Sequence, residues 1–366
     1  MDRDDLLTLA RQVLTLPTAP YHEHHVKAFV VAFCHNLPGV RVEHDRVGNV
    51  IVKYRRPSDE TSAPLVFAAH MDHPGFEILG GNRAEFLGGV PKEMFAKGVG
   101  VRVYSSRGVV RTKLATFDLS AWPKRKLVTL NLEPGTENRF RPGDIGMWDV
   151  PAFRVSDGKL HATAIDDVLG TVVMLATLAE VSQRKLRSHV WCAFTRAEEV
   201  GFPGVMALIH SKRIPKNAFV VSIEMSKERP WARIGNGPIV RIGDRSTVFD
   251  PTATAFLLRA AQRCQERESA FRAQRCLMDG GTCEATAFVG FGYRAGGLCL
   301  PLGNYHNIGR NLRPRAEYVS VNDLEQLVKL TVAVAAERPD PGAGGALLRR
   351  QVLSILRTAP RKLRKI

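Results

Sequence analysis

Residues 64–72 read PLVFAAHMD, and this short stretch does most to decide the fold. Its first part is apolar at nearly every position, so it lacks the alternation of a strand with one face in water. A strand of this kind is typical of a parallel sheet that helices cover on both faces. The run ends on His70 and Asp72, at the carboxyl end of a strand, where such sheets bind their ligands.

Helical and strand patterns alternate on both sides of this stretch. Apolar residues at three- and four-residue spacing predict helices, and short apolar runs predict strands. The predicted helices are 4–16, 23–37, 167–181, 204–211, 252–266 and 321–336. The predicted strands are 40–45, 48–55, 64–70, 189–195, 219–224 and 297–300. We therefore expect an α/β fold with a mostly parallel central sheet and helices on both faces.

Residues 74–154 interrupt this alternation. Their short β runs are broken by Gly, Pro and Asn, and no long helical pattern appears among them. Such a pattern predicts a small all-β, barrel-like module. We therefore expect a discontinuous α/β domain, residues 1–73 and 155–337, with an inserted β domain at 74–154. A linker and a basic tail follow at 338–366.

The charge of the chain raises the question of a polyanionic partner. The 366 residues include 52 Lys and Arg against 36 Asp and Glu, a net charge of +16. Residues 349–366 alone contain seven Lys or Arg and no acid. A basic amphipathic tail can contact membranes or nucleic acid, but we favour a solvated tail and not such contact as the main function.

Cysteine usage and hydropathy indicate the compartment. The six cysteines are scattered without a CxxC pair, which favours reduced thiols over a disulfide framework. No apolar run reaches 18 residues, and the N-terminus lacks a signal-peptide pattern. We expect a cytoplasmic protein.

Acidic residues and histidines recur where predicted strands end. Taken singly, an acidic pair is usually a helix cap or a solvated turn, and a lone His is usually a surface residue. Five such sites at one edge of a sheet are different, because converging carboxylates repel unless cations neutralise them. Two divalent ions would do so, and zinc, cobalt and manganese all accept mixed His and carboxylate ligands. The residues are His70 with Asp72, Asp166 with Asp167, Glu198 with Glu199, Glu224, and His306.

The ordered set of these motifs resembles the glutamyl aminopeptidase and tetrahedral aminopeptidase family of co-catalytic zinc metallopeptidases, in the zinc exopeptidase superfamily. The resemblance covers roughly residues 5–335. The motifs are AAHMDHPGF (68–76), AIDDVLG (164–170), AFTRAEEVGFPG (193–204), VSIEMS (221–226), GGT (280–282) and LGNYHN (302–307).

The resemblance implies a zinc-exopeptidase type fold and a metallo-aminopeptidase with a dinuclear metal centre. His70, Asp166 and Glu224 would hold one ion. Asp166 would bridge to the second ion, which Glu199 and His306 would also hold.

The resemblance also implies roles for two further acids. Glu198 would be the general base, and Asp72 would orient the ring of His70. The inserted β domain is similar to the dimerisation domain of the family, whose members form dimers or twelve-subunit tetrahedra, so we expect a homo-oligomer acting on short peptides.

Four departures from the family pattern stand out. Glu224 occupies a position where Asp is usual, a change that keeps the charge of the ligand. His73 replaces a common acid, and Val168 replaces a common Arg. Cys283 and Glu284 follow GGT where the family tends to have Asp and Ala. The last change bears on substrate, so an amidohydrolase or deacylase acting on N-acylated amino acids is an alternative. A non-catalytic binding protein with a basic tail is another.

Overall fold

The apolar run around Phe67 forms β3 (Leu65–His70), a central strand of an eight-stranded sheet. The computed structural model describes residues 1–56, 63–132, 140–337, 349–350 and 352–353. The strands of the sheet, in spatial order, are β1 (Val40–His44), β2 (Val50–Arg55), β12 (His189–Thr195), β3, β13 (Phe219–Lys227), β16 (Arg294–Leu302), β14 (Ile239–Gly243) and β15 (Gln274–Leu277). The four strands β12, β3, β13 and β16 are parallel, and antiparallel pairings flank them.

Helices cover both faces of the sheet, which explains the continuous apolar sequence of β3. Leu65, Phe67 and Ala69 belong to the larger core cluster, and the alternate residues Val66 and Ala68 belong to the cluster on the other face. The larger cluster includes α1 (Arg3–Leu14), α2 (His24–His35), α3 (Val168–Gln183), α5 (Pro251–Arg267) and α7 (Val321–Ala336). The other includes α4 (Pro203–His210) and α6 (Glu284–Gly290).

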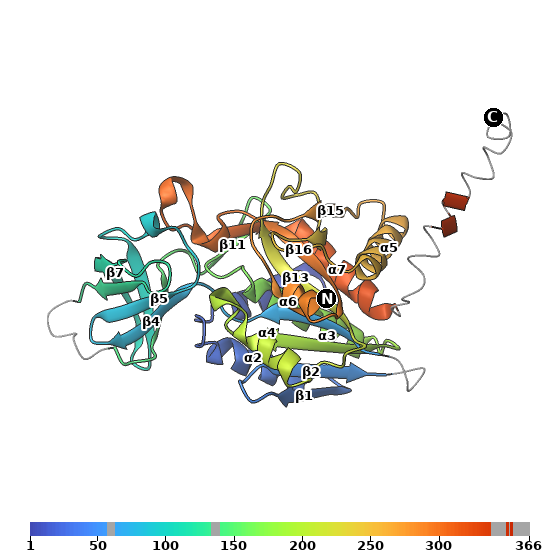
Figure 1. Ribbon diagram of the computed structural model, residues 1–366, viewed down its shortest axis with the longest axis horizontal. Coiled ribbons are helices and arrows are strands. Elements are labelled where there is room, and N and C mark those ends of the chain that lie inside the picture. The colour runs from blue at the N-terminus through green and yellow to red at the C-terminus, as the bar shows by residue number, and fades with distance from the viewer. Residues whose placement is uncertain (57–62, 133–139, 338–348, 351, 354–366) are drawn as a thin grey trace.

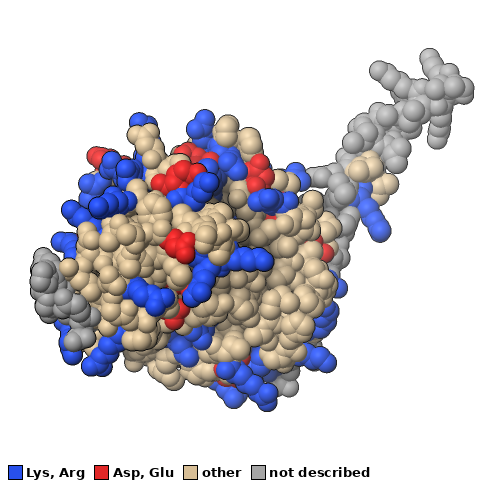
Figure 2. Space-filling model, turned by 60° about the vertical axis from the view of Figure 1, so that its left-hand side comes forward, with Lys and Arg blue, Asp and Glu red and all other residues tan. Residues whose placement is uncertain are grey.

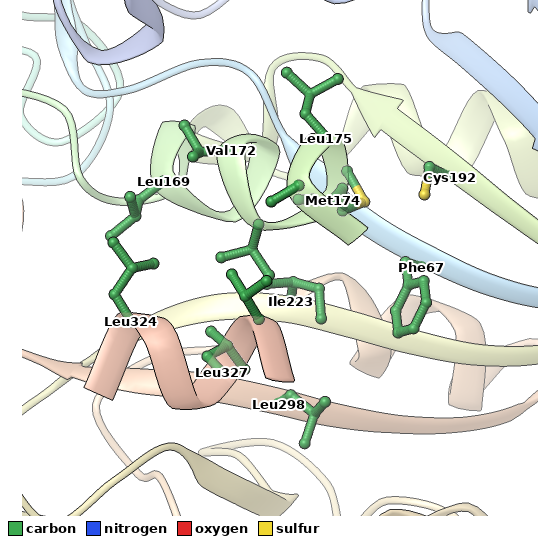
Figure 3. Close-up of a cluster of buried hydrophobic side chains, with 14 of the residues drawn as sticks. Phe67, Leu169, Val172, Met174, Leu175, Cys192, Ile223, Leu298, Leu324 and Leu327 are labelled. Carbon is green, nitrogen blue, oxygen red and sulfur yellow. The ribbon is translucent and has the colours of Figure 1, made fainter. Parts of the chain in front are cut away.

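Helix α3 is the centre of the larger core. Figure 3 shows Leu169 of α3 next to Leu324 of α7, with Ile223 of β13 beside both helices. Nearly every residue of α3 is buried, so this helix is apolar all round. Burial on all sides fixes the position of this helix, which begins directly after Asp167.

A closed six-stranded barrel follows β3 after only four residues, and it lies beside the α/β part in Figure 1. Phe76, Phe86 and Trp148 fill its core, with Phe76 in edge contact with both of the other rings at 4.9 Å. A closed barrel leaves no unpaired strand edge. Its strands are β4 (Gly75–Gly80), β5 (Arg83–Leu87), β8 (Leu127–Leu130), β7 (Gly108–Asp118), β6 (Gly100–Ser105) and β9 (Ile145–Trp148).

A separate three-stranded sheet joins the return of the chain to its end. It contains β10 (Phe153–Ser156), β11 (Lys159–Ala162) and β17 (Glu317–Ser320). Register places Ala162 opposite Glu317. This sheet brings the residues just before α3 close to those just before α7.

The predicted fold class is confirmed, with some elements missed. The patterns did not predict β14, β15 or α6, because these segments are too short to show a clear period. Short 3₁₀ turns were also missed: Lys92–Met94, Glu198–Val200, Tyr305–Asn307 and Arg310–Leu312. All six cysteines are free thiols. None of the helices in the described part of the chain combines the length and apolar character that a membrane crossing needs.

Candidate metal centre

Strands of the main sheet bring four of the predicted site segments to one edge. His70 is the last residue of β3, and Glu198 and Glu199 lie in the 3₁₀ turn after β12. His306 lies in the 3₁₀ turn after β16. Glu224 differs slightly from the prediction, because β13 continues to Lys227. The four segments meet because their strands are parallel neighbours.

Asp166 reaches the same place from the small sheet, between β11 and α3, and not from the end of a main-sheet strand. The peptide bond from Asp166 to Asp167 is cis. Asp167 stands at the N-cap of α3, but its side chain makes no cap hydrogen bond. A Cβ on Gly170 would come within 2.5 Å of both carboxylate oxygens of Asp167, so the glycine leaves room for this buried acid. The usual capping role of an acidic pair does not apply here.

The side chains of these segments converge. The two oxygens of Asp166 face different histidines: Oδ1 lies 3.7 Å from His70 Nε2, and Oδ2 lies 3.5 Å from His306 Nε2. Glu199 Oε1 lies 3.2 Å from His306 Nε2, and Glu198 Oε2 lies 3.8 Å from His70 Nε2. Two ligand atoms on one tetrahedral zinc ion are roughly 3.4 Å apart, so these spacings suit shared ions.

Each histidine presents the same nitrogen to the cluster. The Nδ1–H of His306 donates to the Gly89 carbonyl oxygen at 2.7 Å, and that of His70 donates to the Asp72 carbonyl oxygen at 3.1 Å. A carbonyl oxygen only accepts, so both Nδ1 atoms must carry hydrogen. The Nε2 atoms are then available as ligands, with their rings held in place.

The electrostatics of the cluster call for positive charge. His70 falls in two groups whose ligand atoms lie within 4.8 Å of one another, one with Asp166 and Glu199 and one with Glu198 and Glu224. Oε1 of Glu199 and Oε1 of Glu224 are buried and have no hydrogen-bond partner among the described residues. Burial raises the pKa of Glu224 to about 8, opposed by His70 and reinforced by Asp166.

The pKa values of Glu198 and His70 also indicate an excess of negative charge in the cluster. Burial raises the pKa of Glu198 well above its usual range, and neighbouring acids add to the shift. Burial by itself would lower the pKa of His70, but the Glu198 and Asp72 carboxylates outweigh it and raise the pKa well above its ordinary value. Histidine nitrogens, unpartnered carboxylate oxygens and excess negative charge are what a divalent-cation site requires.

Two buried acids hold the turn that carries Glu198 and Glu199. Asp72 accepts the backbone N–H of Glu198 at 3.0 Å through Oδ1 and that of Glu199 at 3.1 Å through Oδ2. Glu23 accepts the N–H of Ala197 at 2.9 Å and the Nε–H of Arg196 at 2.6 Å. Ala197 has φ 56°, a left-handed conformation that needs such support.

Glu23 was missed by the sequence reasoning. It lies in the run YHEHH, which reads as a solvated helix start, and its partners are about 170 residues away. No signal in the local sequence could have identified it.

Two of the departures from the family pattern have structural accounts. The ring nitrogens of His73 face the Asp166 carbonyl oxygen at 2.5 Å and Asn307 Oδ1 at 2.9 Å, so His73 ties the α3 entry to the turn of His306. Glu284 is fully buried, and burial raises its pKa to about 7. It does not line the hollow beside Glu224.

The hollow beside Glu224 contains a further residue that the sequence reasoning missed. Its lining includes Arg241, Ser226 and the backbone of Gly280–Gly281. Arg241 is 3% exposed and makes only long hydrogen bonds, at 3.3 Å to Ser226 Oγ, 3.4 Å to the Gly243 carbonyl and 3.5 Å to the Gly281 carbonyl. No ion pair within the described residues includes it. Arg241 was missed because β14 is too short to show a pattern.

The sequence profile of the M42 glutamyl aminopeptidase family matches residues 130–330. The chain belongs to this family. The matched segment includes the site residues from Asp166 to His306 and begins after His70. The M42 protein is therefore a metal-dependent aminopeptidase, a hydrolase of peptide bonds.

This chain is similar to several known proteins over nearly their whole length. A protein of Acetivibrio thermocellus assigned as an aminopeptidase is 23% identical over 350 residues, which is 91% of this chain and 99% of the relative. An aminopeptidase from the archaeon Desulfurococcus kamchatkensis is 21% identical with a TM-score of 0.74, over 93% of this chain and 97% of its own. The TET1 peptidase of Pyrococcus horikoshii, which can assemble into a tetrahedron or a large octahedral shell, is 21% identical with a TM-score of 0.72, over 91% and 99%. The two structures show that the fold is shared.

Proposed function

We propose that this aminopeptidase removes N-terminal residues from short peptides at a centre of two divalent metal ions. The observation that carries the proposal is the position of Asp166, whose two oxygens face His70 at 3.7 Å and His306 at 3.5 Å. A carboxylate placed in this way is suited to bridge two metal ions. His70, Asp166 and Glu224 would hold one ion, and Asp166, Glu199 and His306 would hold the other.

We propose zinc as the metal, because imidazole nitrogens and carboxylate oxygens are common zinc ligands. The donors are two imidazole nitrogens and carboxylate oxygens in a buried place, and cobalt and manganese accept the same types. Ions bound there would polarise the peptide carbonyl group and lower the pKa of a water molecule.

Glu198 is the general base in this proposal. Its Oε2 lies 3.8 Å from His70 Nε2, and only 10% of its side chain is exposed. Because burial raises its pKa, the carboxylate holds a proton more readily near neutral pH than an ordinary glutamate does. Glu198 would take a proton from the attacking water and deliver it to the nitrogen of the leaving amine. Asp72 keeps Glu198 in position by accepting a hydrogen bond from the backbone N–H of Glu198.

The position of Arg241 favours substrates that carry an acidic residue at their N-terminus. A buried guanidinium that touches no carboxylate directly is costly. Arg241 lines the hollow beside the proposed ligand Glu224. Burial by itself would lower the pKa of Arg241, but nearby groups that include Glu224 and Asp244 raise it without forming an ion pair. The hollow is narrow, with a cavity volume of about 20 Å³, and it opens to solvent. A Glu or Asp carboxylate of the substrate that reaches this hollow would give Arg241 a direct anionic contact.

Hydrolysis of amino-acid nitroanilides tests the activity and the preference together. We expect the zinc-loaded protein to cleave the Glu compound faster than the Gln compound and to leave the N-acetyl-Glu compound intact. Faster release of nitroaniline from the N-acetyl compound would contradict the aminopeptidase, and release of acetate from that compound would support a deacylase.

The variant Arg241→Met tests the cause of the preference. The ratio of kcat/KM for Glu over Gln should fall by about 10- to 100-fold, the worth of a buried hydrogen bond to a charged group. Lys227→Met is the matched control, because Lys227 lines the same hollow but is exposed. An unchanged ratio in the Arg241 variant would exclude this role.

We also propose that the barrel acts as an inserted domain through which the cytoplasmic protein forms a homo-oligomer. On β7, Val109 is 58% and Phe117 is 43% exposed, although both are large apolar residues. Lys and Arg side chains are scattered over the face in Figure 2 and do not form one stripe, which favours solubility over a nucleic-acid surface. Light scattering of the protein and of Phe117→Glu would test this: a single-chain mass for the parent protein would refute it.

A further inference from the structure

Glu317 is a buried carboxylate that contacts the backbone of two proposed metal ligands at once. Its Oε2 accepts the N–H of Ile165 at 2.8 Å and that of Asp166 at 3.0 Å. Its Oε1 accepts the N–H of His306 at 2.8 Å. Glu317 is fully buried and begins β17, opposite Ala162 of β11.

The chemistry of this contact requires a carboxylate. Three N–H donors point at the two oxygens, and a carboxylate accepts at both of its ends while donating at neither. Glutamine has the same shape, but its NH₂ group would face an N–H donor and leave that donor unsatisfied in a buried place.

The turn that carries His306 needs a partner of this kind. His306 has φ 54° and its neighbour Asn307 has φ 61°, both in the left-handed region. Such residues persist where the surrounding structure holds them. The bond from His306 N–H to Glu317 provides such a hold, while Oε2 of the same carboxylate holds Asp166.

We propose that Glu317 is a positioning residue that sets the spacing between Asp166 and His306 and so determines how tightly the ion they share is bound. This role rests on the two-metal function proposed above. Substitution of residues that orient metal ligands typically weakens metal binding by 10- to 100-fold.

Asp323 provides a matched control. It is also fully buried, and its carboxylate accepts the N–H groups of Gly235 at 2.6 Å and Gly237 at 2.9 Å. It therefore performs the same backbone role without touching a proposed ligand. Glu317→Gln and Asp323→Asn should both lower Tm, but only the first should change metal binding.

The test is a Zn²⁺ titration of chelator-stripped wild type, Glu317→Gln and Asp323→Asn in competition with a chromogenic chelator. We expect two ions bound by wild type and by Asp323→Asn with equal affinity. In Glu317→Gln one ion should bind at least 10-fold more weakly, and added Zn²⁺ should restore the rate of peptide hydrolysis.

Equal Zn²⁺ affinity in Glu317→Gln and Asp323→Asn would overturn the positioning role while leaving the function intact. Absence of Zn²⁺ binding by wild type would overturn the two-metal function and this role with it. If Glu317→Gln does not fold, Glu317→Asp decides: it keeps two accepting oxygens on a shorter side chain, and wild-type affinity in that variant would overturn the proposal.

Discussion

Replacing Glu198 with Gln separates the proton-accepting role of this side chain from every other contact it makes. The amide has nearly the same size, and the backbone N–H of Glu198 would still donate to Asp72. The proposed ligands His70 and Glu199 are unchanged. The variant should therefore fold normally and bind the same number of ions.

The expected loss of rate follows from the position of the side chain. Glu198 is 10% exposed, and burial raises its pKa well above the ordinary value, which makes its carboxylate a stronger base than a surface glutamate. A positioned general base contributes about 10²- to 10⁴-fold, equivalent to roughly 3–5 kcal/mol of barrier. We expect kcat to fall by this factor, with KM changed less than about threefold because an amide does not displace the substrate.

The assay is steady-state hydrolysis of a Glu nitroanilide with metal content measured by elemental analysis on the same sample. Glu199→Gln is the matched control, since it changes the adjacent residue in the same way but removes a proposed ligand. Its activity should recover with added Zn²⁺, whereas that of Glu198→Gln should not. A Glu198→Gln enzyme that retains more than a tenth of kcat, or that loses metal, would refute the reasoning.

Further predictions concern metal, pH and the tail. His306→Ala should lower the metal content from two ions per chain to one, because it removes a nitrogen that faces Asp166 and Glu199; full occupancy would show that the second site is misassigned. In the chelated protein, burial raises the pKa of Glu224 to about 8 and that of Glu284 to about 7. The folded state then binds protons that the unfolded state has released, so the contribution of these two groups to stability is greatest below their ordinary pKa and is lost as pH rises toward 7–8. Thermal melts between pH 6 and 9 should show Tm falling in chelator but not with Zn²⁺, and a rising Tm in chelator would contradict this sign. Deleting residues 346–366 should leave nitroanilide hydrolysis unchanged, and a loss of hydrolysis would give the tail a role in the reaction.

Much of the architecture could be predicted because it depends on patterns local to the chain. The apolar run of β3 requires cover on both faces, and α3 and α4 supply that cover from opposite sides. The interruption after residue 74 is equally visible, because short β runs with frequent Gly and Pro cannot continue an alternation of helices and strands. The predicted boundary between residues 154 and 155 falls inside β10, which pairs with β11 outside the barrel.

Some residues of the candidate site could likewise be predicted from the sequence, and others could be identified only from the structure. Amino-acid order was enough to propose His70, Asp166, Glu198, Glu199, Glu224 and His306, since each lies in a recognisable motif. Only the tertiary structure assigned Glu23, Arg241 and Glu317, whose importance depends on which groups surround them. Glu317 contacts Asp166 across 151 residues of sequence. A carboxylate becomes a backbone acceptor, and a guanidinium becomes a buried charge, only after folding has removed water and brought distant groups against it.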